Sequence, residues 1–487
     1  MSEPTPLGLR FGNEVTDLVR RRICYAFRVF AAIYNYRVVE PAPDTGATCL
    51  EYAARPPSQC GGATCLHIPA LYGPQPQQNQ MRQAFKHRYG GEYLYLFHGI
   101  DPASGNPDWL GEIFEWISSS HESGIQARDT VGRIPYRDML FHKQGISPRK
   151  PYATLLMAWL QNVLRNGNRV EAFAKAPSPI AGAEHLVVCS HDIDFYHVGR
   201  MSTLVRLAKN LGISVLTARS LSFFISNLGL FVGMMGSKRV GDYLPAMLER
   251  IEERAFRSTL FVVPRRGHRR DPNYEVKSLV PCLTTASEMG FSVNLHGSYT
   301  SVIEGNTLTM ESVALAQAIG KKPLGSRQHW LRFDKHEKLF DAIEKAELVF
   351  DSTLGFSEMV GFRNGASFAF PPYDFKSEKP YPFLEIPLVL MDVSLEAASR
   401  NLGEEAQGLA NEVMQESRRW GWGGISVLWH NPVEPLHVPK ETNEVFWNCA
   451  PQQGEEAEKW MTAEQFVKEC LSRYQNAGLM EGVRAGT

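Results

Sequence analysis

The feature that most constrains this chain is a series of short apolar runs, each of which ends on polar residues and leads into a segment of helical character. About seven such units occupy some 300 residues, and strands that alternate with helices predict a parallel sheet closed, or nearly closed, into a barrel. In such barrels reactive side chains gather at the carboxyl ends of the strands. The polar ends are His191–Asp194 after 185–189, a loop of proline, arginine and histidine after 258–263, His296 after 291–295, His329 after the Ser326 region, Asp351 after 348–350, Asp392 after 383–390, and Trp429–Asn431 after 425–428.

The first 150 residues have a different character. At 487 residues the chain is long for one core, so two domains are expected. Residues 22–39 have the pattern of a helix leading to a strand, and 47–52, 63–68 and 93–97 have strand character between turn-rich links. Residues 1–150 show no pattern of candidate catalytic residues. We predict an α/β accessory domain of unknown role over 1–150.

A proline-bearing hinge at 146–150 precedes the helical pattern of 152–165, which leads into a second domain over 151–475. This domain carries an apolar insertion near 205–245. Its stretch 220–235 is apolar over 16 residues, whereas a spanning helix needs about 20. We expect a buried or partner-facing helical insertion, and contact with a membrane surface is the alternative.

Composition excludes some functions. The formal net charge of -1 leaves no basic excess to neutralise phosphates, so we expect no nucleic-acid partner. A basic cluster, Arg265-Arg266 with Arg269-Arg270, is short enough to be either a solvated or a substrate-facing loop.

The eight cysteines lack zinc-site spacing and favour a reducing compartment. Since residues 1–15 hold no apolar core of a secretory signal, we expect a cytoplasmic protein, at the inner membrane face if 220–235 touches lipid.

Several strand ends carry residues suited to hydrolysis. In the segment 190–194 (SHDID) two carboxylates follow an apolar strand, and a hydrolase that activates water needs one carboxylate for a metal and another for a proton. An aspartate after a strand can also simply cap a helix or a turn. His296 and His329 are candidate zinc ligands or, alternatively, structural histidines, and Arg327 can hold a carboxylate ionised. His430 suits a general acid, with a packed core histidine as the alternative.

The order of these motifs resembles a divergent branch of the NodB-type polysaccharide deacetylase superfamily. In that branch an HDxD segment replaces the standard TFDDG motif and is followed by HxSY, RxHxLR and WHN. The chain has, in that order, the segments HDID at 191–194, HGSY at 296–299, RQHWLR at 327–332 and WHN at 429–431. The resemblance spans about 250 residues, and the segment 129–134 (DTVGRI) resembles the one that precedes this domain in such proteins.

The resemblance implies a distorted (β/α)7 barrel of NodB type that removes acyl groups from sugar amides with a divalent metal, usually zinc. By position Asp192 would be the general base, Arg327 the residue that steadies it, and His430 the general acid. Asp194 and His296 would be metal ligands. The chain departs from the standard pattern in two places.

The first departure is Thr300, which stands where the standard motif has its second histidine, so one ligand is missing. His329 is the expected replacement, and His191 is the alternative. The second departure is Ile193, which separates the two aspartates, so that their roles could be exchanged.

We therefore predict a metal-dependent hydrolase acting on the linear amide of an N-acetylated sugar or glycan, with Asp194, His296 and His329 holding the metal. Two alternatives remain open: another metal-dependent C–N amide hydrolase on the same barrel, and a catalytically inactive glycan-binding or assembly protein. Tryptophans can stack on sugar rings, although buried tryptophans are equally expected. The candidates are Trp330, Trp420, Trp422 and Trp429.

Overall fold

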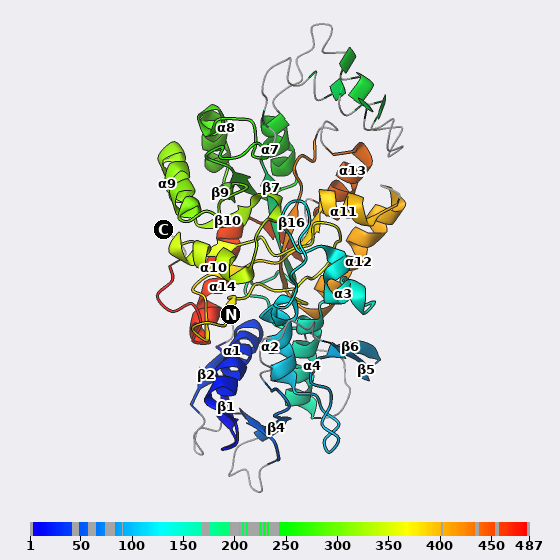
Figure 1. Ribbon diagram of the computed structural model, residues 1–487, viewed down its shortest axis with the longest axis vertical. Helices are drawn as coiled ribbons and strands as arrows, with labels where there is room; N and C mark the ends of the chain where they lie inside the picture. The colour runs from blue at the N-terminus through cyan, green and yellow to red at the C-terminus, as the bar shows by residue number, and fades with distance from the viewer. Residues whose placement is uncertain are drawn as a thin grey trace.

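The structure is a computed structural model. It describes residues 3–484 except 41–47, 57–64, 74–82, 90, 168–174, 401–402, 434–437 and 453–456, and between 195 and 242 it describes only 196, 204, 207–208, 211–212, 224–225, 227–229 and 231–232. The chain forms a central parallel sheet with an N-terminal α/β region below it in the view of Figure 1.

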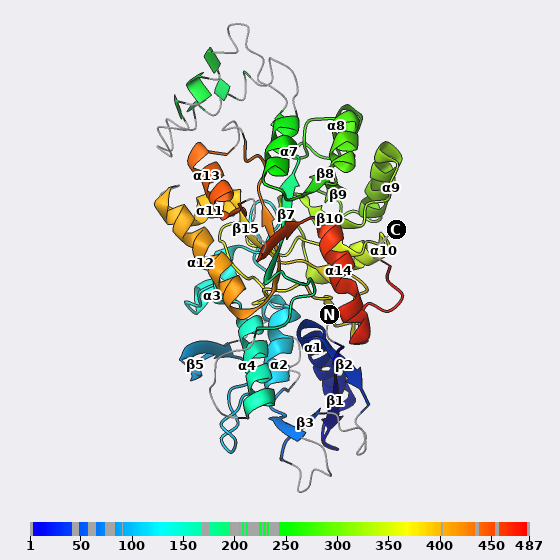
Figure 2. The same ribbon diagram turned by 180° about the vertical axis from the view of Figure 1, so that it is seen from behind.

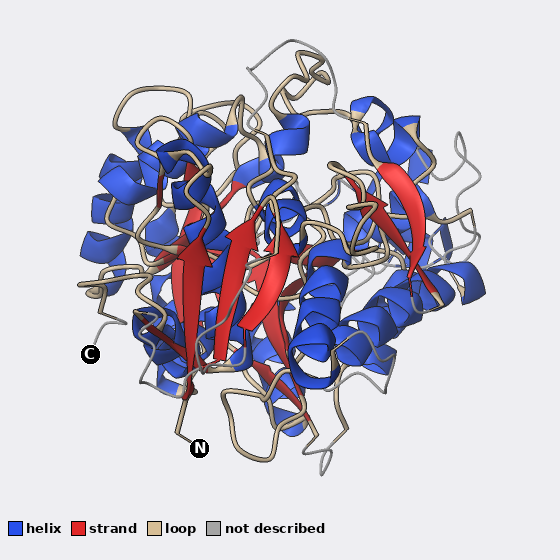
Figure 3. Cartoon of the chain, turned by 90° about the horizontal axis from the view of Figure 1, so that it is seen from below, coloured by secondary structure: helices blue, strands red, loops and turns tan. Residues whose placement is uncertain are grey.

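The central sheet has the strand order β14-β11-β10-β9-β8-β7-β16-β15, and every neighbouring pair is parallel. Its strands are β7 (His185–Asp192), β8 (Thr259–Val262), β9 (Ser292–Gly297), β10 (Gly325–Gln328), β11 (Phe350–Asp351), β14 (Leu384–Glu385), β15 (Leu388–Met391) and β16 (Gly423–Leu428). The two edge strands belong to one run, 384–391, interrupted at Ile386-Pro387. Parallel bridging of Gly355 to Leu388 draws these edges together, so the sheet curls into a distorted (β/α)7 barrel as predicted (Figure 3).

Helices follow most of the strands. The helices α7 (Tyr243–Glu253), α8 (Val276–Glu288), α9 (Thr307–Ile319) and α10 (His336–Lys345) connect β7 through β11 in turn, and α11 (Asp392–Ala398) and α12 (Glu404–Trp420) connect β15 to β16. Between β11 and β14 the described chain instead forms the short hairpin β12 (Tyr373–Asp374) and β13 (Lys379–Pro380). The helix expected between these two strands is therefore absent from this described segment.

The C-terminal segment returns to the barrel. After α13 (Lys440–Cys449), strand β17 (Glu458–Met461) pairs in parallel with the first half of β7. Helix α14 (Ala463–Asn476) starts with a capping box, in which Thr462 and Gln465 satisfy each other's backbone N–H groups. It packs near α1 in the N-terminal region (Figure 2).

The N-terminal region holds a parallel sheet of order β2-β1-β3-β4 and a hairpin, β5 (Phe85–Tyr89) with β6 (Glu92–Leu96). The predicted helix and strand of 22–39 are α1 (Asp17–Tyr34) and β2 (Tyr36–Val39), and the other strands are β1 (Thr5–Phe11), β3 (Thr48–Ala53) and β4 (Cys65–Pro69). The helices α2 (Trp109–Ile117), α3 (Leu140–Lys143) and α4 (Tyr152–Asn166) complete it, with the short 3-10 turns Ser120–Glu122 and Tyr136–Asp138.

One apolar core joins this region to the barrel. It includes Ile23 and Phe30 of α1, Leu186 and Val188 of β7, and Phe466 of α14. The N-terminal region thus packs against the amino half of β7, and the HDID segment lies at the opposite end of that strand. The boundary at residue 150 stays a prediction, because α4 beyond it packs on α2 before it.

Most of the apolar insertion near 205–245 lies outside the described residues. In the described part of 220–235, the apolar side chains of Ile225, Leu228 and Val232 are 57%, 41% and 61% exposed. No helix in the described part of the chain combines the length and the apolar character needed to cross a membrane.

The pairing of β17 with β7 includes a partly buried ionic contact that predicts a pH dependence of stability. Glu458 accepts hydrogen bonds from Arg418 at 2.6 and 3.0 Å and from His185 at 2.7 Å. Burial opposes ionisation of Glu458, but these hydrogen bonds outweigh it and lower its pKa from 4.5 to about 2. Burial lowers the pKa of His185 despite Glu458, so the imidazole donates in its neutral form and Arg418 supplies the positive charge.

A lowered carboxyl pKa stabilises the fold above the unfolded-state value of 4.5 and loses that effect as the pH falls towards 2. Glu458→Gln is therefore expected to lower the free energy of unfolding by about 1–3 kcal/mol at pH 7 and by much less at pH 3. Denaturant unfolding of both proteins at the two pH values measures this difference. Equal destabilisation at both would contradict the assigned ion pair.

Candidate metal centre

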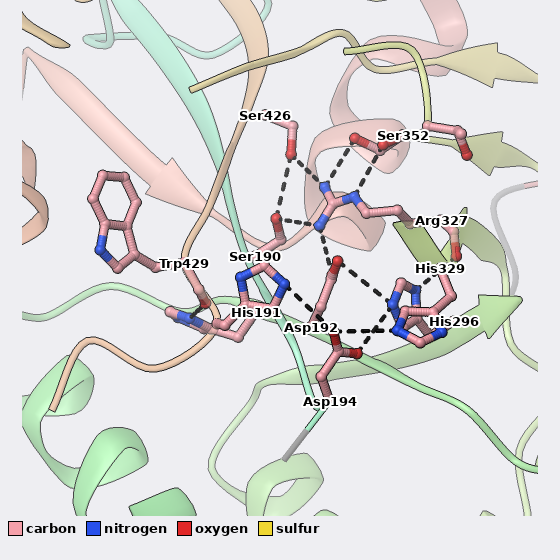
Figure 4. A network of polar contacts seen from close by, with 12 residues as sticks. Ser190, His191, Asp192, Asp194, His296, Arg327, His329, Ser352, Ser426 and Trp429 are labelled. Atoms are coloured by element: carbon pink, nitrogen blue, oxygen red, sulfur yellow. Dashed lines mark hydrogen bonds and ion pairs between the residues drawn. The ribbon is translucent and has the colours of Figure 1, made fainter. Parts of the chain in front are cut away.

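The carboxyl end of β7 delivers two aspartates to the barrel mouth (Figure 4). Every residue of β7 is buried, and Asp192, its last residue, is 3% exposed. The side chain of Asp194, two residues further, is 12% exposed. Ile193, between them, is fully buried in the apolar core around the sheet. The intervening isoleucine thus anchors the segment while both carboxylates face the mouth.

Asp194 lies between two histidines from neighbouring strand ends. Its Oδ1 is 3.3 Å from Nε2 of His296, at the end of β9, and its Oδ2 is 3.4 Å from Nε2 of His329, which follows β10. One potential ligand atom from each of these three residues lies within 4.8 Å of the others. The structure therefore brings together the three residues that the sequence predicts as metal ligands, from the carboxyl ends of β7, β9 and β10.

The chemistry of this group fits a divalent cation. Nδ1 of His296 donates to the carbonyl oxygen of Arg327 at 2.8 Å, which leaves the lone pair of a neutral imidazole on Nε2. Nε2 of His296 and Oδ1 of Asp194 are both buried without a hydrogen bond, although they face each other. Two lone pairs at this separation are explained by a cation between them. One carboxylate and two imidazoles are a ligand set that zinc uses in catalytic sites, with a further position left for water or substrate.

His329 is tied to a second carboxylate. Its Nδ1 lies 3.5 Å from Oδ1 of Asp271. Burial opposes protonation of His329, but Asp194 and Asp271 outweigh it and raise its pKa to about 9. Burial likewise opposes ionisation of Asp194, and His329 outweighs it, so the pKa of Asp194 is lowered well below its usual range. The carboxylates of Asp194 and Asp271 therefore favour a positive charge at His329, whether from a proton or from a cation.

Asp192 is oriented by a fully buried arginine. Nη1 of Arg327 donates to Oδ1 of Asp192 at 2.8 Å and to the Ser190 hydroxyl at 2.9 Å. The other N–H groups donate to the carbonyl oxygen and hydroxyl of Ser352 and to the Ser426 hydroxyl, so all five have acceptors. The remaining oxygen of Asp192, Oδ2, faces Nε2 of His296 at 3.7 Å. Arg327 thus holds one oxygen and leaves the other directed at the metal centre.

His430 approaches the centre from β16. Its Nδ1 is 2.8 Å from Oδ1 of Asp392, its backbone N–H donates to Oδ2 of the same carboxylate, and its Nε2 lies 3.5 Å from Oδ2 of Asp194. Burial opposes protonation, but Asp392 and Asp194 outweigh it and raise the pKa of His430 well above its usual value. The imidazole is therefore held in its charged form with Nε2–H directed at the site.

Two carboxylates of this site had no role in the sequence-based prediction, namely Asp271 and Asp392. Asp392 stands at a predicted strand end, which is the signal that could have identified it. Asp271 follows the arginine cluster in a loop, where nothing in the sequence sets it apart. Their contacts with His329 and His430 become visible only when distant strand ends meet.

The alternative ligand, His191, lies outside this group. Its Nδ1 is 2.6 Å from the carbonyl oxygen of Trp429, its Nε2 is 3.8 Å from Sγ of Cys189, and burial lowers its pKa to about 4.

Of the four tryptophans considered for sugar stacking, Trp420, Trp422 and Trp429 are buried. Trp330 is 44% exposed and adjoins His329.

No family model matches the chain, and no curated protein matches it either. Among solved structures, it is similar to the polysaccharide deacetylase Bc1974 from Bacillus cereus, with 9% identity, a TM-score of 0.29, and coverage of 57% of this chain and 91% of that one. It is also similar to the Bc1960 peptidoglycan N-acetylglucosamine deacetylase, with 9% identity, a TM-score of 0.30, and coverage of 58% and 87%. At these scores neither similarity assigns an activity, so the function proposed below rests on the residues of the site.

Proposed function

We propose that this chain is a metal-dependent hydrolase that removes an acetyl or other acyl group from an N-acylated sugar or glycan. The observation that carries the proposal is the division of roles around one centre. One carboxylate, Asp194, faces two imidazoles, and a second, Asp192, is held apart by Arg327. A charged imidazole, His430, completes the site. Metal-dependent hydrolysis of an amide uses these three kinds of group: metal ligands, a general base and a general acid.

Asp194, His296 and His329 would hold the metal, with zinc as the expected ion, and a bound zinc ion supplies polarisation of the amide carbonyl and acidification of water. Oδ2 of Asp192 accepts the proton of the water whose oxygen bonds to the acyl carbon. Arg327 keeps that carboxylate oriented. Nε2 of His430 donates its proton to the amide nitrogen as the C–N bond breaks. The products are a carboxylic acid and a free amine.

Acetate release tests this function. The purified, zinc-loaded chain is incubated with N-acetylglucosamine, N-acetylglucosamine oligomers and simple N-alkyl acetamides, and free acetate is measured. We expect release from a sugar substrate. Release from the simple amides alone would favour a different C–N hydrolase. Failure to bind a divalent ion or to release acetate from any substrate would favour a non-catalytic binding protein.

One observation supports the contact with a membrane surface proposed from the sequence. Ile225, Leu228 and Val232 are spaced by three and four residues, which is the spacing of one helical face, and all three side chains are exposed. We expect the chain to float with vesicles that contain anionic lipid and Ile225→Asp/Val232→Asp to remain at the bottom of the gradient. Val313→Asp on α9 is the control, since Val313 is 52% exposed elsewhere on the surface. A wild-type chain that does not float would contradict this contact.

A further inference from the structure

The basic cluster noted in the sequence lies beside the metal centre. It occupies the loop 264–271, here called the arginine loop, which directly follows β8. Because β8 pairs with β7 on one side and β9 on the other, this loop leaves the sheet between the strand ends that carry Asp194 and His296. The topology therefore places the arginine loop at the mouth of the barrel.

Asp271 fixes this loop to the site. Its Oδ2 accepts hydrogen bonds from the backbone N–H groups of Gly267 and His268, at 2.9 and 2.6 Å. Its Oδ1 accepts from the N–H of Tyr299 at 2.7 Å and approaches His329 at 3.5 Å. One buried carboxylate thus connects the turn of the arginine loop, the segment after β9 and a candidate metal ligand.

The loop presents positive charge without an opposing carboxylate. Arg265, Arg266 and Arg269 are exposed, and among the described residues no carboxylate lies within 4.0 Å of their guanidinium groups. Arg266 donates to the neutral side chain of Asn273. Glu311 is an acid within electrostatic reach of Arg265, and its burial raises its pKa to about 7. Three cations are therefore available to an anion that enters the mouth.

An exposed aromatic ring completes the rim. Trp330 adopts a φ of 67°, a left-handed conformation that is unusual for a residue with a large side chain and is typical of functional sites. Its backbone oxygen accepts from Arg133 at 3.2 Å, and its ring N–H donates to the carbonyl oxygen of Arg270 at 3.4 Å. The ring is thus held beside both the arginine loop and His329, where a sugar ring could stack on it.

We propose that the arginine loop binds an anionic group of the substrate, so that the substrate is an acidic N-acylated sugar or glycan that carries a phosphate or a carboxylate. This rests on the proposed function. Guanidinium groups bind both anions through paired N–H donors, and a cluster of one sign at the mouth concentrates anions there. The chain as a whole carries a net charge of only -1, so this concentration of cations is local.

Three probes that differ only at C6 test the proposal: N-acetylglucosamine, its 6-phosphate and its C6 uronic acid. Calorimetric titration of the zinc-loaded chain at low salt is expected to show at least about tenfold tighter binding of one or both anionic probes than of the neutral one. The two anionic arms decide between phosphate and carboxylate. Arg265→Ala/Arg269→Ala is expected to remove the advantage, whereas Arg21→Ala, an exposed arginine on α1, is expected to keep it.

Equal affinities for all three probes, no measurable binding of either anionic probe, or an advantage that survives in the double variant would each overturn the proposal. The double variant also separates binding by the loop from direct binding of phosphate to zinc, because it leaves the metal ligands in place. Acetate release measured in parallel distinguishes the two proposals. Charge-selective binding without acetate release would contradict the hydrolase function alone, and acetate release without charge selectivity would contradict the arginine loop alone.

Discussion

Asp194→Asn is expected to abolish both stoichiometric binding of a divalent metal and acetate release, while the chain remains folded. Asp194 contributes the carboxylate between His296 and His329. The amide that replaces it has nearly the same shape but no negative charge, and its NH₂ group would face at least one imidazole nitrogen. Since the carboxylate is one of three protein ligands, its loss leaves only two imidazoles to hold a dication.

Metal content after gel filtration, together with acetate release, measures this effect. Asp17→Asn is the matched control, because Asp17 is an exposed carboxylate in the first turn of α1. It is expected to retain both metal and activity. A metal-loaded and active Asp194→Asn variant would contradict the assignment of Asp194, and loss of folding would be detected by circular dichroism and by the melting temperature.

Asp192→Asn is expected to separate catalysis from metal binding. The ligand set stays complete, so the metal content should match that of the wild-type chain. The amide cannot accept the proton of the attacking water, so kcat should fall by about 10²- to 10⁴-fold, with a smaller change in KM. Arg327 loses its carboxylate partner while four of its N–H groups keep theirs, and a loss of about 3–5 kcal/mol in unfolding free energy should accompany the change.

Assays well below the melting temperature of the variant keep these two effects apart. Unchanged kcat in a metal-loaded Asp192→Asn variant would rule out Asp192 as the general base. Loss of the metal with Asp192→Asn and its retention with Asp194→Asn would instead mean that the roles of the two aspartates are exchanged, which is the possibility raised by the intervening Ile193.

The strand ends are the part of the fold that the sequence predicts well. Each predicted run from 185 onward contributes to the sheet, and most of these strands are continuous apolar segments, as is usual for buried parallel strands. The exception is β10 (Gly325–Gln328), which is buried but polar. The structure differs at 383–390, where Ile386-Pro387 divides the run into β14 and β15 at opposite edges of the sheet. Proline has no N–H to donate to a neighbouring strand, so the sequence could have predicted the break. That the two halves of the run lie at the two edges of the sheet depends on contacts with distant residues such as Gly355, and these are not visible in the sequence.

The sequence predicts the candidate metal ligands but not the residues that hold the site's side chains in place. Asp194, His296 and His329 stand in motifs that mark them in the sequence, and the structure places them together. Ser190, Ser352 and Ser426, which satisfy Arg327, come from three separate strand ends and carry no signal of their own. The same holds for Asp271, whose partners lie on the segments after β9 and β10. Such roles follow from the closure of the barrel and not from local spacing.

A crystal structure of the zinc-loaded chain tests the central claim most directly. We expect one ion at the mouth of the barrel, about 2.0–2.2 Å from a carboxylate oxygen of Asp194 and from one ring nitrogen each of His296 and His329. Asp192 should approach the ion's open side without binding it as a protein ligand. An ion bound by His191, an ion at another place in the chain, or a zinc-saturated crystal with no ion between these three residues would contradict it.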